Sequence, residues 1–245
     1  MPRYFIEVSY KGTCYAGFQV QQNANTIQAE MEKALTIYFK IKAELTGSSR
    51  TDAGVHAFQN YFHFDLDLKN GRKKIEESIY HLNAILPGDI VVNKIYEVGE
   101  TAHCRFDARE RSYRYSIYTF KDPFLNDRAF YYPYKLDFNL LQEAAERIIR
   151  HSCFQSFSKR NTQVNSFECN IIESHWEQSE TGYSYHVTAN RFLRGMVRGL
   201  VGTMLKVGRN KCSISEFENI LRSKDSSLAD FSVPPQGLTL VGVQF

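Results

Sequence analysis

The chain has 245 residues, of which 43% are hydrophobic, so it can form one large domain or two small ones, and global disorder is excluded. Its net charge of +3 permits an anionic partner without requiring one. The five cysteines are widely spaced and form no C-x-x-C pair, which argues against a zinc ribbon and is typical of free thiols. We find no signal-peptide pattern and no apolar run of the roughly 18–20 residues that a membrane span needs, and therefore expect a soluble cytoplasmic protein.

The first half of the chain mixes strand and helix patterns. Apolar residues alternate from Tyr4 to Tyr10, which predicts a strand. Asn25 and Gln28 resemble an N-terminal capping pair for a helix that reaches about Phe39. The next predicted elements are a strand at Ile41–Thr46, a strand at Phe58–Phe64, a helix through Ile75, Ile79 and Leu82 that ends at Pro87-Gly88, and a strand at Ile90–Glu97.

The second half repeats this mixed rhythm. Arg111–Phe120 alternates as a strand, and Asp137 is placed to cap a helix. The later predicted elements are a polar, mobile loop at 154–164, strands at Cys169–Glu177 and Tyr183–Ala189, helices at Phe192–Val207 and Ile214–Leu221, and a closing strand at Leu238–Gln244. Because regular β-α-β alternation is missing, we expect an α+β fold of two similar halves, with domains at 1–108 and 109–245.

The stretch from Gly47 to His56 carries the clearest chemistry. Its glycines permit unusual backbone angles, and its small side chains let a partner approach closely. It presents the guanidinium of Arg50, the carboxylate of Asp52 and the imidazole of His56. Two interpretations are open: a hairpin turn in which Asp52 bonds its own backbone, or a carboxylate offered to a partner.

This stretch resembles the R-T-D-A-G-V-H-A motif of the tRNA pseudouridine synthase A (TruA) family, and the resemblance extends over nearly the whole chain. Further similar segments are Tyr10 to Gln19, Asn83 to Ile90, His103 to Tyr115, Asn190 to Arg198 and Gly237 to Leu240. Each shorter motif is weak by itself, but their order and spacing together are specific. The chain departs from the family pattern at Ser48-Ser49 and at Cys153.

The resemblance implies a fold, a reaction and partners. It implies two α/β halves whose mainly antiparallel sheets join across a central RNA-binding cleft. The reaction isomerises uridine to pseudouridine in the anticodon stem-loop of tRNA, at positions 38, 39 and 40. It breaks the C1′–N1 bond and makes a C1′–C5 bond, with no metal and no cofactor. The family also implies a homodimer.

The resemblance assigns Asp52, Tyr113 and Arg198 as catalytic. A carboxylate acts as a nucleophile or a base, and a nearby cation favours its ionised form. A phenol stacks on uracil or passes a proton, although Tyr115 and Tyr118 fit a strand equally well. At helical spacing, Arg194 and Arg198 on the predicted helix at Phe192–Val207 fall within roughly 60° of Arg191, which directly precedes it, and glycines lie beside them. An ordinary solvated helix face is the alternative.

The predicted substrate-binding residues are Arg50, Leu240, His56, Arg191 and Arg194. The guanidinium of Arg50 would fill the space that a flipped base leaves, or grip phosphate. The imidazole of His56, like that of His103, is as well explained by a structural hydrogen bond. Basic clusters that together could follow an RNA backbone are Lys69, Arg72, Lys73 and Lys74; Arg105, Arg109, Arg111 and Arg114; and Lys159-Arg160.

Two other functions compete with the synthase. A non-catalytic RNA-binding protein or RNA chaperone would use the same aromatic and basic residues. A carboxylate-dependent hydrolase would need a second acid at a suitable separation, and the motif offers only Asp52.

Overall fold

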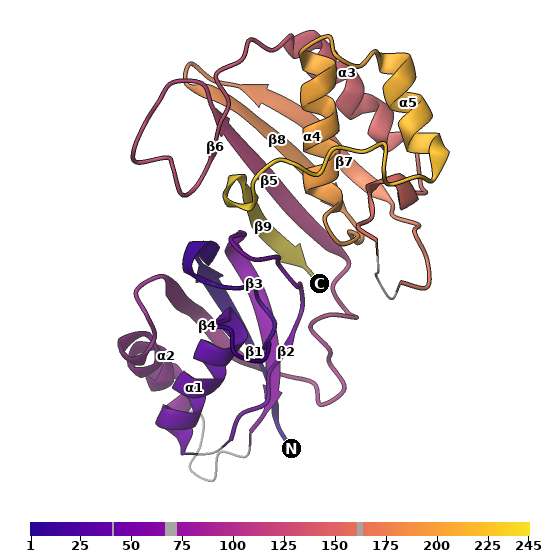
Figure 1. The fold of residues 1–245 in the computed structure, drawn as a ribbon. Helices are drawn as coiled ribbons and strands as arrows, with labels where there is room; N and C mark the ends of the chain where they lie inside the picture. Colours follow the sequence, from indigo (N-terminus) through magenta and orange to yellow (C-terminus); the bar gives the residue numbers. More distant parts are fainter. Residues whose placement is uncertain (41, 67–72, 161–163) are drawn as a thin grey trace. The chain divides into compact units, whose positions relative to one another are not determined.

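The computed structural model describes residues 1–40, 42–66, 73–160 and 164–245. They form two compact units: unit 1 is Met1–Arg109 with Leu240–Phe245, and unit 2 is Glu110–Thr239 (Figure 1). Each unit combines a mainly antiparallel sheet with helices, so the expected α+β fold class is confirmed. The domain boundaries 1–108 and 109–245 stay a prediction.

The sheet of unit 1 is built around β1 (Arg3–Tyr10), as the alternating pattern predicted. β1 pairs antiparallel with β3 (His56–Asp65) on one side and with β4 (Ile90–Val98) on the other. The short β2 (Thr46–Gly47) pairs with the far end of β3, and β9 (Leu238–Gln244) borders β3 through its unit 1 residues. The helices α1 (Ile27–Phe39) and α2 (Lys73–Ile85) lie on one face of this sheet (Figure 1).

The start of α1 differs from the prediction. Thr26 caps the helix, since its hydroxyl accepts the Ala29 N–H at 3.3 Å. The predicted capping pair of Asn25 and Gln28 is therefore wrong, and the Gln28 carboxamide instead bonds Glu32 and the Leu45 carbonyl. The helix ends at Phe39, where Lys40 adopts a left-handed conformation with φ of 60°. Of the predicted strand at 41–46, Ile41 lies outside the described residues.

The sheet of unit 2 runs in the order β5 (Glu110–Tyr118), β8 (Gly182–Ala189) and β7 (Ile171–Gln178), all antiparallel. The two-residue β6 (Phe130–Tyr131) adds a parallel pairing to β5. Tyr115 on β5 faces Tyr185 on β8, and both side chains are fully buried. Trp176 lies beside Tyr185, so large aromatic side chains fill the core of this unit.

Three helices of unit 2 begin at residues whose local chemistry is clear. Asp137 caps α3 (Phe138–Ile149) as predicted, since its carboxylate accepts the Asn139 and Leu140 N–H groups. Ser213 caps α5 (Ile214–Ser223) in a capping box with Glu216. α4 (Met196–Gly208) begins four residues later than predicted, because Gly195 at its start is left-handed, with φ of 76°. Short 3-10 turns occur at Gly12–Cys14, Gln155–Phe157 and Pro235–Gly237.

The remaining expectations concern cysteines, membrane spans and one loop. No disulfide joins the cysteines, all of which fall within the described part of the chain. Of the helices described, none is both long enough and apolar enough to cross a membrane. The expected loop at 154–164 contains the 3-10 turn Gln155–Phe157, and its residues 161–163 lie outside the described residues.

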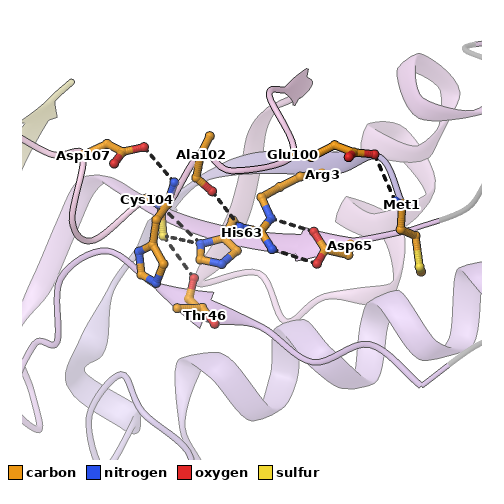
Figure 2. A network of polar contacts seen from close by, with 10 residues as sticks. Met1, Arg3, Thr46, His63, Asp65, Glu100, Ala102, Cys104 and Asp107 are labelled. Atoms are coloured by element: carbon orange, nitrogen blue, oxygen red, sulfur yellow. Dashed lines mark hydrogen bonds and ion pairs between the residues drawn. The ribbon is translucent and has the colours of Figure 1, made fainter.

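A polar network fixes the segment that follows β4 onto the sheet of unit 1 (Figure 2). The Arg3 guanidinium holds the Asp65 carboxylate through two contacts of 2.6 and 2.8 Å and donates to the Ala102 carbonyl. The His63 Nδ1 lies 3.2 Å from the Cys104 Sγ and accepts the Cys104 N–H. The chain from Ala102 to Cys104 is thereby tied to β1 and β3 before it enters unit 2.

This network predicts a pH-dependent stability for unit 1. Burial, with smaller effects of the neighbouring His103 and Arg3 side chains, lowers the pKa of His63 to about 4. In the unfolded chain a histidine titrates near 6.5, so the unfolded chain binds more protons between those pH values. The contribution of neutral His63 to the free energy of unfolding is complete above about pH 6.5, and it falls as the pH drops toward 4. Hydrogen exchange of the β1 and β3 amides, converted to opening free energies, measures this slope.

A His63→Gln variant should show a flatter slope between pH 6.5 and 4. The exposed His81 on α2 provides the control, and His81→Gln should keep the slope of the unchanged chain. Equal slopes in the two variants would contradict the assignment to His63.

Candidate active site

A buried carboxamide holds the loop between β2 and β3. Asn60 on β3 is fully buried, and its Nδ2 donates to the Ser49 carbonyl at 2.9 Å and to the Tyr10 hydroxyl at 3.1 Å. Its Oδ1 accepts the Ser48 hydroxyl and the Tyr61 N–H, each at 2.9 Å. All four hydrogen-bonding positions of the amide are therefore used. The loop from residue 48 onward is fixed to the strand that follows it.

The backbone around Asp52 is fixed from the other side by the segment after β1. The Tyr10 hydroxyl lies 2.8 Å from the Thr51 Oγ1, and the Phe18 N–H donates to the Thr51 carbonyl at 3.1 Å. Gly17, with φ of 111°, passes so close that a Cβ there would lie 3.1 Å from the same carbonyl oxygen. Only glycine adopts this angle without strain. The backbone next to Asp52 is consequently held by the segment that contains Tyr10, Gly17 and Phe18.

The Asp52 side chain takes no part in closing its turn. The Val55 N–H donates to the Asp52 carbonyl at 3.2 Å, and Gly54 provides the left-handed residue, with φ of 78°. The Asp52 carboxylate is half-buried. Among the described residues of unit 1, none forms a hydrogen bond or an ion pair with it. The interpretation of Asp52 as a turn former that bonds its own backbone is therefore wrong. The loop therefore leaves the carboxylate available as a hydrogen-bond acceptor.

Arg50 and His56 flank Asp52 in different ways. Arg50 is exposed, whereas His56 is buried and accepts the Gly12 N–H on its Nδ1 at 3.0 Å. A Cβ on Gly12 would overlap the Val55 carbonyl, so this backbone approach requires glycine. His56 thus anchors the loop after β1, and its contact with substrate stays a prediction.

The structure of unit 2 distinguishes Tyr113, Tyr115 and Tyr118, which the strand pattern alone could not distinguish. Tyr115 is fully buried and donates its hydroxyl to the Pro234 carbonyl at 2.8 Å, while burial raises the pKa of its phenol. Tyr118 is buried against the Tyr131 ring. Tyr113 is half-buried and contacts the Phe192 ring edge-on, with centroids 5.1 Å apart. Of the three, Tyr113 has the most accessible ring.

Arg198 lies in the first turn of α4, where backbone oxygens hold it. Its Nε and Nη2 donate to the Val233 carbonyl at 2.8 and 2.6 Å. Arg191 and Arg194 lie before the helix begins at Met196, so the predicted helical face that was to unite the three arginines is wrong. The physical reason is the left-handed Gly195, which turns the chain between Arg194 and the helix.

Other predicted residues are located as follows. Leu240 is fully buried on β9, in unit 1 with Asp52. Arg105 and Arg109 are exposed in the segment after β4, and Arg160 lies 3.9 Å from Asp225. Lys69 and Arg72 fall outside the described residues. Where the structure describes the chain, no group of three His, Cys, Asp or Glu side chains could hold a metal ion.

Sequence reasoning missed two parts of this arrangement. It did not identify Asn60, because β3 carries several other polar residues and nothing in its sequence distinguishes this one. It also gave no role to the glycines beside the arginines, whereas Phe231 lies against Gly199 and Asp230 lies against Gly202.

Comparisons with known proteins agree over both units. A family model described as tRNA pseudouridine synthase matches residues 6–107 and 144–245. The tRNA pseudouridine synthase A of Parabacteroides distasonis is 40% identical over 248 residues, which cover 100% of this chain and 96% of that protein. That of Porphyromonas gingivalis is 40% identical, with coverages of 100% and 98%, and that of Staphylococcus saprophyticus is 38% identical, with coverages of 97% and 89%.

The Asn60 network predicts a large loss of stability when its amide is removed. Asn60→Ala should lower the free energy of unfolding by about 2–3 kcal/mol, because buried partners lose their hydrogen bonds. Asn83 also bridges backbone groups with its amide, at Val92, but is exposed. Asn83→Ala should cost only about 1 kcal/mol or less. Urea unfolding measures both, and equal losses would contradict the importance of the buried network.

Proposed function

The chain belongs to the tRNA pseudouridine synthase family, and from that premise we propose that Asp52 is the carboxylate on which its isomerisation depends. The family converts uridine to pseudouridine in tRNA, so this protein is an isomerase acting on tRNA. The observation that carries the proposal for Asp52 is its rigid backbone combined with a carboxylate that no described residue of unit 1 engages. A side chain that stabilised the loop would be expected to bond within it.

The reaction defines what the residues must do. The C1′–N1 glycosidic bond breaks, the uracil turns while it stays bound, and a C1′–C5 bond forms. The proton on C5 is lost and N1 gains one, so the atoms balance between substrate and product. The protein must therefore supply a nucleophile or base, a proton path, and a pocket that retains the detached base.

Three routes are open to Asp52 as the nucleophile or base of the reaction. Its carboxylate attacks C1′, adds to C6 of the ring, or removes a proton from the sugar. Each route needs an ionised oxygen held at a fixed position, because a reacting group that is already oriented avoids much of the entropic cost of the step. The hydrogen bonds that Thr51 makes with Phe18 and Tyr10 supply that fixed position.

We assign the remaining roles by chemistry. Arg198 would favour the ionised carboxylate of Asp52, since a nearby guanidinium stabilises negative charge. Tyr113, with the most accessible ring of the three tyrosines, would stack on the uracil or move a proton. Leu240 would pack against the base. Arg191 and Arg194 would contact RNA phosphate from the segment that leads into α4.

The target uridines are proposed to be those at positions 38, 39 and 40 in the anticodon stem-loop. A base in a stem must leave its stack, which costs on the order of a few kcal/mol. The exposed Arg50, two residues before Asp52, would occupy the vacated space with its planar guanidinium. We also propose a homodimer in the cytoplasm, where its tRNA substrate is found.

Replacement of Asp52 tests the central claim. Asp52→Asn keeps the size of the side chain but removes its charge and nucleophilicity, so isomerisation should fall by at least about a thousandfold. Tritium release from [5-³H]uridine-labelled anticodon stem-loop RNA measures the reaction, and tRNA affinity and folding should change little. Asp122→Asn, in a loop of unit 2, is the matched control and should keep full activity. Full activity of Asp52→Asn would refute the proposal, and binding without tritium release by the unchanged protein would favour a non-catalytic RNA-binding protein.

Base flipping by Arg50 has a separate test. Arg50→Ala should slow isomerisation of a paired target uridine, because nothing replaces the lost stacking. The defect should shrink when the target is mismatched, since an unpaired base leaves the helix at lower cost. Single-turnover rates on the two RNAs measure the difference. An equal defect on both would assign Arg50 to phosphate binding instead.

A further inference from the structure

A short segment, Asp230–Pro234, lies against the glycine-containing face of α4; we refer to it as the strap. A Cβ on Gly199 would lie 2.7 Å from the Phe231 ring, and a Cβ on Gly202 would overlap the Asp230 carbonyl oxygen. Glycine within a helix is less stable than alanine, so its presence here has a structural cost. These glycines let the strap backbone approach the helix more closely than any side chain would allow.

Two sets of contacts anchor the strap at its ends. At the first end, the Asp230 N–H donates to the Thr203 hydroxyl at 3.0 Å, and Lys206 lies 3.1 Å from the Asp230 carboxylate. At the other end, the Tyr115 hydroxyl donates to the Pro234 carbonyl at 2.8 Å. The strap is thus fixed to α4 at one end and to the buried Tyr115 of β5 at the other.

The middle of the strap holds Arg198. The Val233 carbonyl accepts two of its N–H groups, from Nε at 2.8 Å and from Nη2 at 2.6 Å. The Phe231 carbonyl lies 3.5 Å from the same Nη2. Carbonyl oxygens satisfy hydrogen bonds without cancelling charge, so the guanidinium remains able to bind an anion. Its Nη1 has no hydrogen-bond partner among the described residues of unit 2.

We propose that the strap is a positioning device for Arg198, and that Tyr115 and Thr203 are positioning residues that act through it. This inference rests on the proposed function, in which the Arg198 guanidinium favours the ionised form of the Asp52 carboxylate. A free arginine side chain loses rotamer entropy when it is held in one geometry. Because the strap fixes one edge of the guanidinium, less of that cost falls on the reaction, and Nη1 is left available to bind an anion.

Two buried tyrosines provide a matched test. Tyr115 and Tyr185 are cross-strand neighbours, both fully buried, and each hydroxyl makes one hydrogen bond of 2.8 Å. Only the Tyr115 hydroxyl reaches the strap, since that of Tyr185 pairs with Ser174. Tyr115→Phe should lower kcat for isomerisation about tenfold while KM for tRNA stays within about twofold. Tyr185→Phe should leave both constants unchanged.

A double substitution distinguishes positioning from a loss of folded protein. Lysine cannot donate two hydrogen bonds to one carbonyl as the guanidinium does, so Arg198→Lys removes the geometry that the strap maintains. Adding Tyr115→Phe to Arg198→Lys should then cause no further loss of kcat, because residues that act as one unit are not additive. Thr203→Val, at the opposite end of the strap, should behave like Tyr115→Phe.

The outcomes separate the two claims. Absence of tritium release by the unchanged protein would refute the proposed function itself. If the unchanged protein is active, equal kcat values for Tyr115→Phe and Tyr185→Phe would overturn the strap proposal. Multiplicative losses in the double variant would overturn it as well, since Tyr115 would then act independently of Arg198.

Discussion

The Asn60 carboxamide is the interaction on which the Asp52 loop depends. It lies in the interior of unit 1, where an unmade hydrogen bond is costly, and its two donors and two acceptor positions are all occupied. A fully satisfied buried network permits only one arrangement of the groups that it joins. The Ser48–Thr51 segment is therefore held against β1 and β3 by these hydrogen bonds, although it has no regular structure.

Rigidity in the loop has a direct chemical consequence. A carboxylate that accepted hydrogen bonds from its own turn would stabilise the loop but would be less available to substrate. Here the backbone hydrogen bond from Val55 to Asp52 closes the turn instead. Gly54 and Gly17 make that possible, because they adopt angles that other residues rarely take. The loop is thus stabilised entirely by groups other than the carboxylate that it presents.

In unit 2, too, a charged side chain, that of Arg198, is held by backbone groups. The glycines of α4 admit the strap, and the strap's carbonyl oxygens hold the Arg198 guanidinium without neutralising it. An acidic partner in the same place would have held the side chain equally well and cancelled its charge. In both units, the functional group of the proposed site is oriented by neighbours that leave its charge available.

The sequence by itself determined the elements and motifs that depend on neighbours along the chain. The alternation of β1, the Asp137 cap of α3 and the small-residue loop around Asp52 are all local, so they were predictable. The start of α4 was predicted wrongly, because the left-handed Gly195 overrides an apolar pattern that reads as helix from Phe192. Only the tertiary structure decided the role of Asn60, the burial of Tyr115 and the contact between Arg198 and Val233. Those depend on pairs such as Tyr115 and Pro234, 119 residues apart, whose contact is set by how strands and helices pack.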